Sequence, residues 1–380
     1  MKKNKIYIRG AYGPGNIGDD VLMLSVINIV KKVVPEKFIS VGVEHPSLAR
    51  KYNSNIDWIH IKKPISADVV VFGGGGQFFS FNPPPGVKSS LISKVIKSIK
   101  AQENLFTAIE RLKVSSCGGL DKIYIPRKLA AFCIGLGPFD NHGKGYQRAV
   151  EIINKCDYVS VRDDKSKSYC KMLGNESVSE FTDPTLLSDI WYPNQIKKPY
   201  YSDKGYISIV LRDWPHDKNG QDFTKELIKF GNYLINNGEK VRFVSVYKER
   251  EEDLIAKNDN IDWLVWDARN YSIVEFMNEF VGNSEVIISS RAHGVLLPAS
   301  LGVPTIAVAI ENKLLKVHDM ISDGNIIVKI AEHKAFDEAL TCFRKDKEQL
   351  RVNLEQEITK NHQKVKDAID EFTKWLKDNV

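Results

Sequence analysis

The chain has 380 residues, of which 43% are hydrophobic, 10% aromatic and 27% charged. This length favours two domains of ordinary size, and the composition excludes collagen, a disulfide-rich miniprotein and a disordered chain. The formal net charge of +6 is too small for a dedicated nucleic-acid-binding protein, so we expect no nucleic-acid partner. It is compatible with small anionic substrates.

The cysteines and the N-terminal sequence indicate the cellular compartment of the protein. The chain has 5 cysteines, widely spaced and without a CxxC pair, which predicts neither a disulfide framework nor a cysteine-bound zinc ion. The N-terminus lacks the apolar stretch of a signal peptide, and no run of about 18 apolar residues occurs anywhere. We therefore expect a cytoplasmic protein whose only membrane contact is peripheral, at the inner face.

Short apolar runs rich in Val, Ile and Phe alternate with helical segments in the first half of the chain. This alternation is typical of βαβ units and predicts an α/β fold with a parallel sheet. We assign residues 1–187 to an N-terminal Rossmann-like domain. Its predicted strands are Lys5–Arg9, Phe38–Val43, Asp68–Phe72, Ala130–Gly135 and Asp157–Arg162.

A glycine-rich loop follows the first predicted strand, and Gly13, Gly15 and Gly18 give it a GxGxxG pattern. This pattern suggests a dinucleotide site. However, Asp19 and Asp20 place two carboxylates at the start of the next helix, where they would repel a pyrophosphate. One aspartate is enough to cap the helix, so the other is available to face a ligand.

A second glycine run, Gly73–Gly76, ends the predicted strand Asp68–Phe72. Without side chains, these residues let the backbone come close to a ligand or to another strand. A ligand-binding role for Gly74 and Gly75 and a tight exit from the strand both fit this run.

A basic insertion occupies residues 88–128, with nine Lys or Arg against three Asp or Glu, so its local excess equals the net charge of +6. Its apolar residues follow helical spacing, which predicts a basic amphipathic helix. Two interpretations remain open. The helix packs on its own domain, or it forms an electrostatic landing surface for a phosphate-bearing or membrane-borne acceptor.

Residues 188–204 contain two prolines and little periodicity, which indicates a linker. A second Rossmann-like domain is predicted over residues 205–343, followed by C-terminal helices over 344–380, where apolar residues recur at helical spacing. The predicted strands of the second domain are Tyr206–Arg212, Val241–Tyr247, Val286–Ser289 and Thr305–Ala309.

Basic residues follow several of these strands: Arg162, Arg212, Arg291 and His293, with Lys313 past the next strand. Ligands of doubly wound sheets bind beyond the carboxyl ends of the strands, so these side chains are candidates for one pocket. Arginine forks match phosphate and carboxylate oxygens, and a helix beginning after Arg291 adds free N–H groups. His293 can exchange a proton near neutral pH, as general acid–base catalysis requires. The histidines show no metal-ligand spacing, so we expect no metal.

Several motifs occur together along the chain: GxxGxxNxGD from Gly10 to Asp19, the run Gly73–Gly76, SxRDxxS from Ser160 to Ser166, DPxLL from Asp183 to Leu187, and the segment Ser289–Pro304 around Arg291 and His293. Through these motifs the chain resembles the polysaccharide pyruvyl transferase family over roughly Lys5 to Lys313. The resemblance implies a GT-B-like fold, with two Rossmann-like halves facing a cleft. It also implies transfer of pyruvate from phosphoenolpyruvate to a sugar as a ketal, with release of phosphate and without a metal or other cofactor.

The resemblance also implies roles for individual residues. Arg291 and His293 would bind phosphoenolpyruvate in the half formed by residues 205–343, and Asp19 would lie near the sugar hydroxyls of the acceptor in residues 1–187. Arg162 and Arg212 would line the same cleft, Lys313 would support the anion site, and Asn16, Gly74 and Gly75 would contact substrate. We hypothesise that His293 donates the proton to phosphoenolpyruvate or protonates the leaving phosphate, and that Asp19 acts as the base for a hydroxyl.

The sequence leaves alternatives open for the acceptor and for the class of reaction. The sugar belongs to a cell-surface polysaccharide or its precursor, and it is carried by a lipid, a nucleotide or a polymer. A nucleotide-sugar glycosyltransferase on the same fold is the first rival function, and a catalytically silent binding protein that keeps the pocket is the second. The paired Asp19 and Asp20 disfavour a nicotinamide-dependent dehydrogenase.

Overall fold

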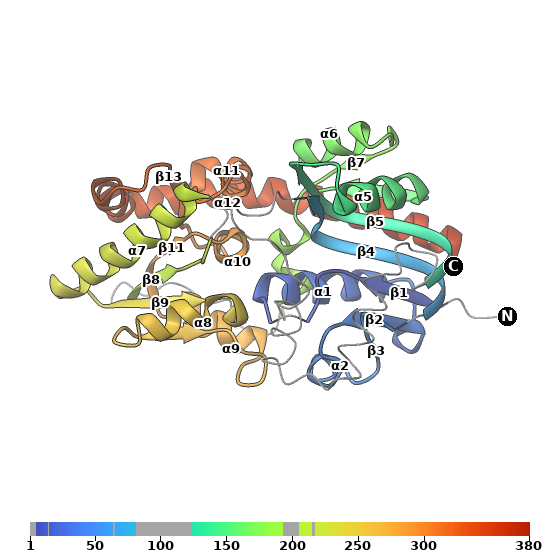
Figure 1. The fold of residues 1–380 in the computed structure, drawn as a ribbon, viewed down its shortest axis with the longest axis horizontal. Helices are drawn as coiled ribbons and strands as arrows, with labels where there is room; N and C mark the ends of the chain where they lie inside the picture. Colours follow the sequence, from blue (N-terminus) through green and yellow to red (C-terminus); the bar gives the residue numbers. More distant parts are fainter. Residues whose placement is uncertain (1–4, 14, 64, 81–123, 193–204, 215–216) are drawn as a thin grey trace.

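A computed structural model describes residues 5–13, 15–63, 65–80, 124–192, 205–214 and 217–380 of the chain. Within them the chain forms two parallel sheets, each flanked by helices, which lie side by side (Figure 1). This arrangement confirms the predicted α/β fold with two Rossmann-like halves.

The first sheet has the strand order β3-β2-β1-β4-β5-β6-β7, and all neighbouring strands are parallel. Its strands are β1 (Ile6–Arg9), β2 (Ile39–Val43), β3 (Asp57–His60), β4 (Ile65–Ser80), β5 (Tyr124–Phe139), β6 (Tyr158–Val161) and β7 (Ser179–Glu180). Its α-helices include α1 (Ile17–Val30), α2 (Pro46–Ala49), α5 (Lys144–Lys155) and α6 (Asp164–Met172). Buried apolar residues fill β1 and β2, as strands covered on both faces require.

The second sheet has the order β10-β9-β8-β11-β12-β13 and is also parallel. Its strands are β8 (Tyr206–Val210), β9 (Val241–Ser245), β10 (Trp263–Val265), β11 (Ser284–Ser289), β12 (Ile306–Val308) and β13 (Ile326–Val328). The helices that connect them are α7 (Lys218–Asn236), α8 (Lys248–Lys257), α9 (Ile273–Gly282), α10 (Ala292–Ser300) and α11 (Asn312–Asp319). The four predicted strands are present, whereas the short edge strands β10 and β13 were not predicted.

The strand β4 corrects one prediction. It does not end before Gly73 but continues through the whole glycine run to Ser80, paired with β5 throughout. Gly74 and Gly75 have φ angles of 65° and 71°, which only glycine adopts at low cost, and the register with β5 shifts just beyond them. The glycines therefore distort the strand locally, and its pairing with β5 continues on both sides of them.

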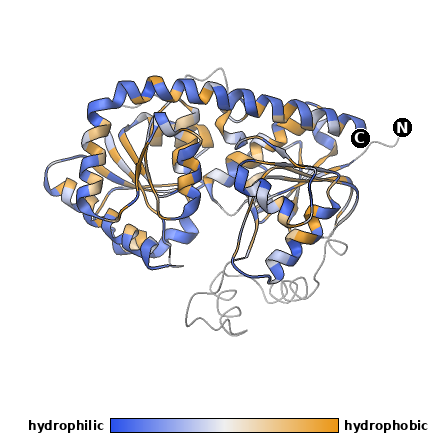
Figure 2. Ribbon diagram, turned by 90° about the horizontal axis from the view of Figure 1, so that it is seen from above, coloured by the Kyte–Doolittle hydropathy of each residue, from blue (hydrophilic) through white to orange (hydrophobic). Residues whose placement is uncertain are grey.

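The C-terminal helix α12 (His333–Asn379) joins the two halves. It begins earlier than residue 344 and is a single helix of 47 residues, about 70 Å long. Phe336 and Leu354 pack in the core of the second sheet, whereas Ile369 and Phe372 pack in the core beside the first. Figure 2 shows α12 running along both halves with its hydrophilic side outward.

Two predicted segments lie largely outside the described residues. Of the basic insertion 88–128, only residues 124–128 are described, and they begin β5, so its predicted helix cannot be placed. Of the predicted linker 188–204, residues 188–192 are described, and Trp191 and Tyr192 are buried in the core that also contains α1. No helix in the described segments has the length and the apolar character needed to cross a bilayer.

Candidate active site

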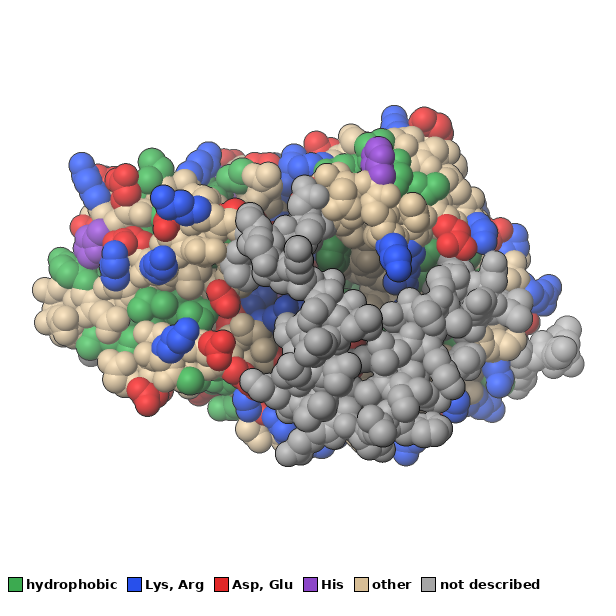
Figure 3. All heavy atoms as spheres, viewed as in Figure 1, with side chains coloured by type: hydrophobic (Ala, Val, Ile, Leu, Met, Phe, Trp, Pro, Cys, Tyr) green, Lys and Arg blue, Asp and Glu red, His purple; other side chains and the backbone are tan. Residues whose placement is uncertain are grey.

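The carboxyl ends of strands in both sheets carry the predicted basic residues. Arg162 directly follows β6, and Arg212 and Arg291 lie two residues beyond the ends of β8 and β11. Lys313 lies in the first turn of α11, which follows β12. Arg162 and Arg212 are near enough to Lys313 to lower its pKa, so the four cations form one cluster, here called the cationic cluster. Figure 3 shows Lys and Arg side chains in the hollow between the halves.

A buried carboxylate, Asp183, lies beside Arg162 and His293. Arg162 Nη1 donates to Asp183 Oδ2 over 2.8 Å, and His293 Nε2 is 3.9 Å from the same oxygen. The other carboxylate oxygen accepts hydrogen bonds from the backbone N–H and the hydroxyl of Thr185. Asp183 is 0% exposed. Burial alone would raise the pKa of Asp183, but Arg162 and the two hydrogen bonds from Thr185 outweigh burial and hold it below its ordinary value.

The imidazole of His293, in the first turn of α10, is 8% exposed. Burial holds its pKa well below the ordinary value, and Lys313, Arg162 and Arg291 lower it further, against the opposing effect of Asp183. The imidazole is therefore neutral at pH 7. This differs from the expectation that His293 exchanges a proton near neutral pH, because the cations gathered around it disfavour a further positive charge.

Two arginines of the cationic cluster have acidic partners that the sequence analysis missed. Arg291 donates to Glu251 of α8, which is 0% exposed and also accepts from the Ser245 hydroxyl over 2.6 Å. Arg212 donates to Glu311 and lies over the Trp214 ring, with its guanidinium carbon 4.0 Å from the ring centre. These contacts fix the direction of each guanidinium group before any ligand binds.

Lys313 differs from the arginines of the cluster. Within the described part of the chain, its ammonium group makes no hydrogen bond or ion pair. Burial lowers its pKa from 10.5 to about 8, and the neighbouring Arg162 adds to this effect. Lys313 is therefore a cation at pH 7 whose donors are available to an anion.

Asp19, in the first turn of α1, faces the cationic cluster from the first half. Its carboxylate accepts from Asn16 Nδ2 over 2.8 Å, and Asn16 caps α1 by accepting from the N–H of Gly18. Burial raises the pKa of Asp19 from 3.8 to about 6, although Lys313, Asn16, Arg162 and Arg291 lower it. A carboxylate with this pKa is suited to accept a proton at neutral pH.

The start of α1 is fixed against the second half of the chain. The N–H of Ile17 donates to the carbonyl of Val246 over 3.1 Å, and Asn16 forms an isolated antiparallel bridge with Tyr247. Gly18 packs directly on the His293 ring, and a Cβ at this position would overlap Nδ1 and Cγ of the imidazole. The glycine just before Asp19 is thus needed for His293 to approach α1.

Asp20 points away from the cluster and accepts a 2.9 Å hydrogen bond from the indole N–H of Trp266 in the second half. Burial raises its pKa from 3.8 to about 7. A raised pKa in the folded state means that stability is highest below the ordinary pKa and is lost as the pH rises to about 7.

We therefore expect Asp20→Asn, which keeps the acceptor for Trp266, to increase the free energy of unfolding at pH 8 by a few kcal/mol and to leave it nearly unchanged at pH 4. Each unit of pKa corresponds to about 1.4 kcal/mol. Urea unfolding at the two pH values measures this, with exposed Asp253→Asn as the control. Equal gains at both pH values would contradict the expectation.

The structure places Gly74 and Gly75 against α1. A Cβ on Gly75 would lie 3.6 Å from Asp19 Oδ1, so this glycine borders the site. A Cβ on Gly74 would instead meet Leu22 Cδ2 at 2.8 Å, and the Gly74 carbonyl accepts from Gln77. Gly75 therefore leaves room beside Asp19, whereas Gly74 lets β4 pack closely on α1.

Among the functional candidates, Asp183, Glu251 and Glu311 were not predicted. Asp183 is the first residue of the DPxLL motif, so this motif could have indicated that it belongs to the site. Glu251 and Glu311 follow β9 and β12, but nothing in their local sequence distinguishes them from exposed acidic residues. Across the described residues, no group of three or more His, Cys, Asp or Glu side chains is placed to hold a metal ion.

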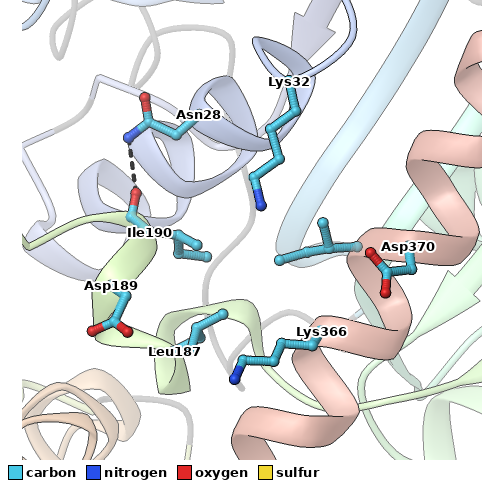
Figure 4. A pocket seen from close by; sticks show the side chains of 8 residues that line it. Asn28, Lys32, Leu187, Asp189, Ile190, Lys366 and Asp370 are labelled. Atoms are coloured by element: carbon cyan, nitrogen blue, oxygen red, sulfur yellow. Dashed lines mark hydrogen bonds between the residues drawn. The ribbon is translucent and has the colours of Figure 1, made fainter.

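A separate cavity of ≈ 480 Å³ lies between α1, α12 and residues 187–190 (Figure 4). Neither the residues of the cationic cluster nor Asp19, Asp183 and His293 line it. Its lining residues are Asn28, Lys32, Leu187, Asp189, Ile190, Lys366, Ile369 and Asp370.

A family model of polysaccharide pyruvyl transferases matches residues 16–312, and a comparison with curated proteins finds no match. HepE of Anabaena, solved with UDP and glucose, is 11% identical with a TM-score of 0.53, over 98% of this chain and 99% of its own. UDP-GlcNAc 2-epimerase of Neisseria meningitidis, solved with UDP-GlcNAc, is 13% identical with a TM-score of 0.53, over 97% and 99% of the two chains.

At such low identity these structures show the fold alone, which is GT-B-like with a C-terminal helix. The family match is more specific, because it covers more than half of the chain and includes the segments that carry Asp19, Arg162 and His293. The chain therefore belongs to the polysaccharide pyruvyl transferase family.

Proposed function

We propose that the protein transfers pyruvate from phosphoenolpyruvate to two hydroxyls of a sugar in a cell-surface polysaccharide or its precursor, forms a ketal and releases phosphate. The observation that carries this proposal is the cationic cluster around one neutral imidazole, with Asp19 facing it from the other half. The reaction needs no cofactor, and we propose that it takes place in the cytoplasm.

The cationic cluster suits phosphoenolpyruvate, a compact acid with a carboxylate and a phosphate. Lys313 has free donors, and Arg291 Nε is a buried donor with no partner among the residues that the structure describes. Arg291 also caps α10 without a side-chain hydrogen bond to the helix, so the first N–H groups of α10 can bind an anion. Since Glu251 and Glu311 already orient Arg291 and Arg212, these arginines need little rearrangement on binding.

The proposed chemistry balances with the groups present. A proton from His293 adds to the methylene carbon of phosphoenolpyruvate, and the first sugar hydroxyl attacks the resulting cationic carbon. Phosphate then leaves, and the second hydroxyl attacks the same carbon to close the ketal. Of the two hydroxyl protons, one passes through Asp19 and restores His293, and the other leaves on phosphate as hydrogen phosphate.

Binding of phosphoenolpyruvate provides the protonated imidazole that this scheme requires. Burial is the main cause of the low pKa of His293, and the charges of Lys313, Arg162 and Arg291 lower it further. An anion that binds between these cations balances their charges. A negative charge beside the ring favours the protonated imidazole, so it raises the pKa of His293 toward 7. In this scheme the histidine becomes an acid only when the donor substrate is present.

Phosphate release from phosphoenolpyruvate, measured across lipid-linked and nucleotide-linked sugars, tests the proposal. We expect release with at least one acceptor, and we expect phosphoenolpyruvate to raise the melting temperature. A melting temperature raised by UDP but not by phosphoenolpyruvate would favour a nucleotide-sugar glycosyltransferase. Binding of phosphoenolpyruvate without release on any acceptor would favour a silent binding protein.

The same panel separates the two kinds of acceptor. Nucleotide-sugars bind to the solved structures of HepE and the Neisseria epimerase, which supports including a nucleotide-linked sugar. If residues 88–128 instead contact a membrane and a lipid-linked acceptor, neutralising their Lys and Arg residues lowers release only with the lipid-linked sugar.

A further inference from the structure

We propose that Asp183 is the positioning residue of the site: it holds the His293 imidazole in the tautomer with the proton on Nε2 and anchors the guanidinium of Arg162. This inference rests on the proposed function, because it assigns how the proton donor of that reaction is oriented. The contacts around the fully buried carboxylate of Asp183 support this inference.

Thr185 fixes the direction of the Asp183 carboxylate. Both donors that fix Oδ1 come from Thr185, through its N–H at 3.1 Å and its hydroxyl at 2.8 Å. This pair of bonds leaves Oδ2 directed at Arg162 Nη1, 2.8 Å away, and at His293 Nε2, 3.9 Å away. The carboxylate cannot turn without losing the Thr185 contacts, so its direction is set by the chain around it.

The surroundings of Nε2 determine which nitrogen of the His293 ring carries the proton. Nε2 is buried and has no hydrogen-bond partner among the described residues, and the nearest acceptor given by the structure is Asp183 Oδ2. A lone pair on Nε2 would face the lone pairs of a carboxylate, whereas a proton on Nε2 faces an acceptor. Hydrogen bonds of catalytic groups are often long without substrate and shorten when it binds. The arrangement therefore favours the Nε2–H form.

In this tautomer the other ring nitrogen, Nδ1, carries a lone pair and no proton. Nδ1 lies against Gly18, the residue before Asp19, and so faces the half of the protein that we assign to the acceptor. With Nε2 protonated, Nδ1 is the nitrogen that gains and gives a proton during turnover. The Asp183 carboxylate also stabilises the positive charge that forms on the ring, because it lies 3.9 Å from Nε2 and raises the pKa of His293.

Nitrogen NMR of the full-length protein labelled with ¹⁵N-histidine tests the tautomer without substrate. The chain has 8 histidines, and the spectrum of His293→Gln identifies the signals of His293 by their absence. We expect the wild-type ring to be neutral and protonated on Nε2 at pH 7. A wild-type ring protonated on Nδ1 would overturn the proposal, even if Asp183→Asn does not fold.

The matched variants are Asp183→Asn, which removes the charge and keeps the shape, and Thr185→Val, which removes one donor to Asp183 and keeps the carboxylate. We expect Asp183→Asn to mix the two tautomers and to lower kcat at least about tenfold, since loss of the correct tautomer in a comparable His–Asp pair lowers kcat by about 10⁴. The KM for phosphoenolpyruvate should change less than kcat. Thr185→Val keeps the backbone N–H that donates to Asp183 Oδ1, so it should keep the wild-type tautomer and lower kcat much less than Asp183→Asn does.

An Asp183→Asn protein with the wild-type tautomer and kcat would refute the positioning role. Equal effects of Asp183→Asn and Thr185→Val on tautomer and kcat would refute it too, since both would then reflect general loss of structure. If the wild-type protein releases no phosphate with any acceptor, the proposed reaction fails instead, and the tautomer measurements alone decide the role of Asp183.

Discussion

His293→Gln should lower the rate of phosphate release from phosphoenolpyruvate by about a hundredfold or more, the range typical of a general acid or base. Glutamine has a similar size and keeps a polar end group, so it fits beside Gly18 and Asp183. It cannot carry a proton to carbon, and kcat should therefore fall much more than the affinity for phosphoenolpyruvate.

Steady-state kinetics and calorimetric binding of phosphoenolpyruvate measure the two effects separately. His333→Gln is the control, because this histidine begins α12 and packs on Tyr233, away from the cationic cluster. A His293→Gln enzyme with near-normal turnover would show that the imidazole does not transfer the proton. Lys313, whose pKa of about 8 also allows proton transfer, would then be the first candidate.

Arg291→Met should reduce both stability and activity strongly. The substitution leaves Glu251 without its cation, although this carboxylate is 0% exposed and keeps Ser245 as a donor. Breaking a buried ion pair by removing one partner typically lowers the free energy of unfolding by about 3–5 kcal/mol. Arg291 also supplies a buried donor to the proposed anion site, so turnover should fall by about a hundredfold or more.

The double variant Arg291→Met with Glu251→Gln separates these two effects. Glutamine can still accept from Ser245, and no charge is left buried, so most of the lost stability should return in urea unfolding. Turnover should stay low, because the guanidinium is still missing. Recovery of turnover together with stability would show that Arg291 has only a structural role.

The fold could be predicted to a large extent because central strands of both sheets, such as β1 and β11, are buried on both faces. Runs such as Ile6–Ile8 and Val286–Ile288 are continuous and apolar, and the periodicity changes clearly at each helix. The short edge strands β10 and β13 lack that signal, since three residues give no measurable alternation. The glycine run was misplaced because its pairing with β5 depends on residues more than fifty positions away.

The site was predictable only in part. The positions of Arg162, Arg291 and His293 follow from a general rule about the carboxyl ends of parallel strands. Their acidic partners do not, because they are distant in the sequence: Arg291 and Glu251 are separated by 40 residues and Arg212 and Glu311 by 99. The low pKa of His293 was missed for the same reason, since it results from burial and from cations that only the folded chain brings together.

The helix α12 has a consequence for how substrates enter. One uninterrupted helix contributes Leu354 to one core and Phe372 to the other, so α12 is a stiff connection that is packed against both halves. If one half rotates away from the other, α12 must bend or its apolar side chains must become exposed to water. The free-energy cost of either change grows with the angle of rotation. Access to the space around His293 is therefore governed by small local movements at its rim, and a wide swing of the two lobes is disfavoured.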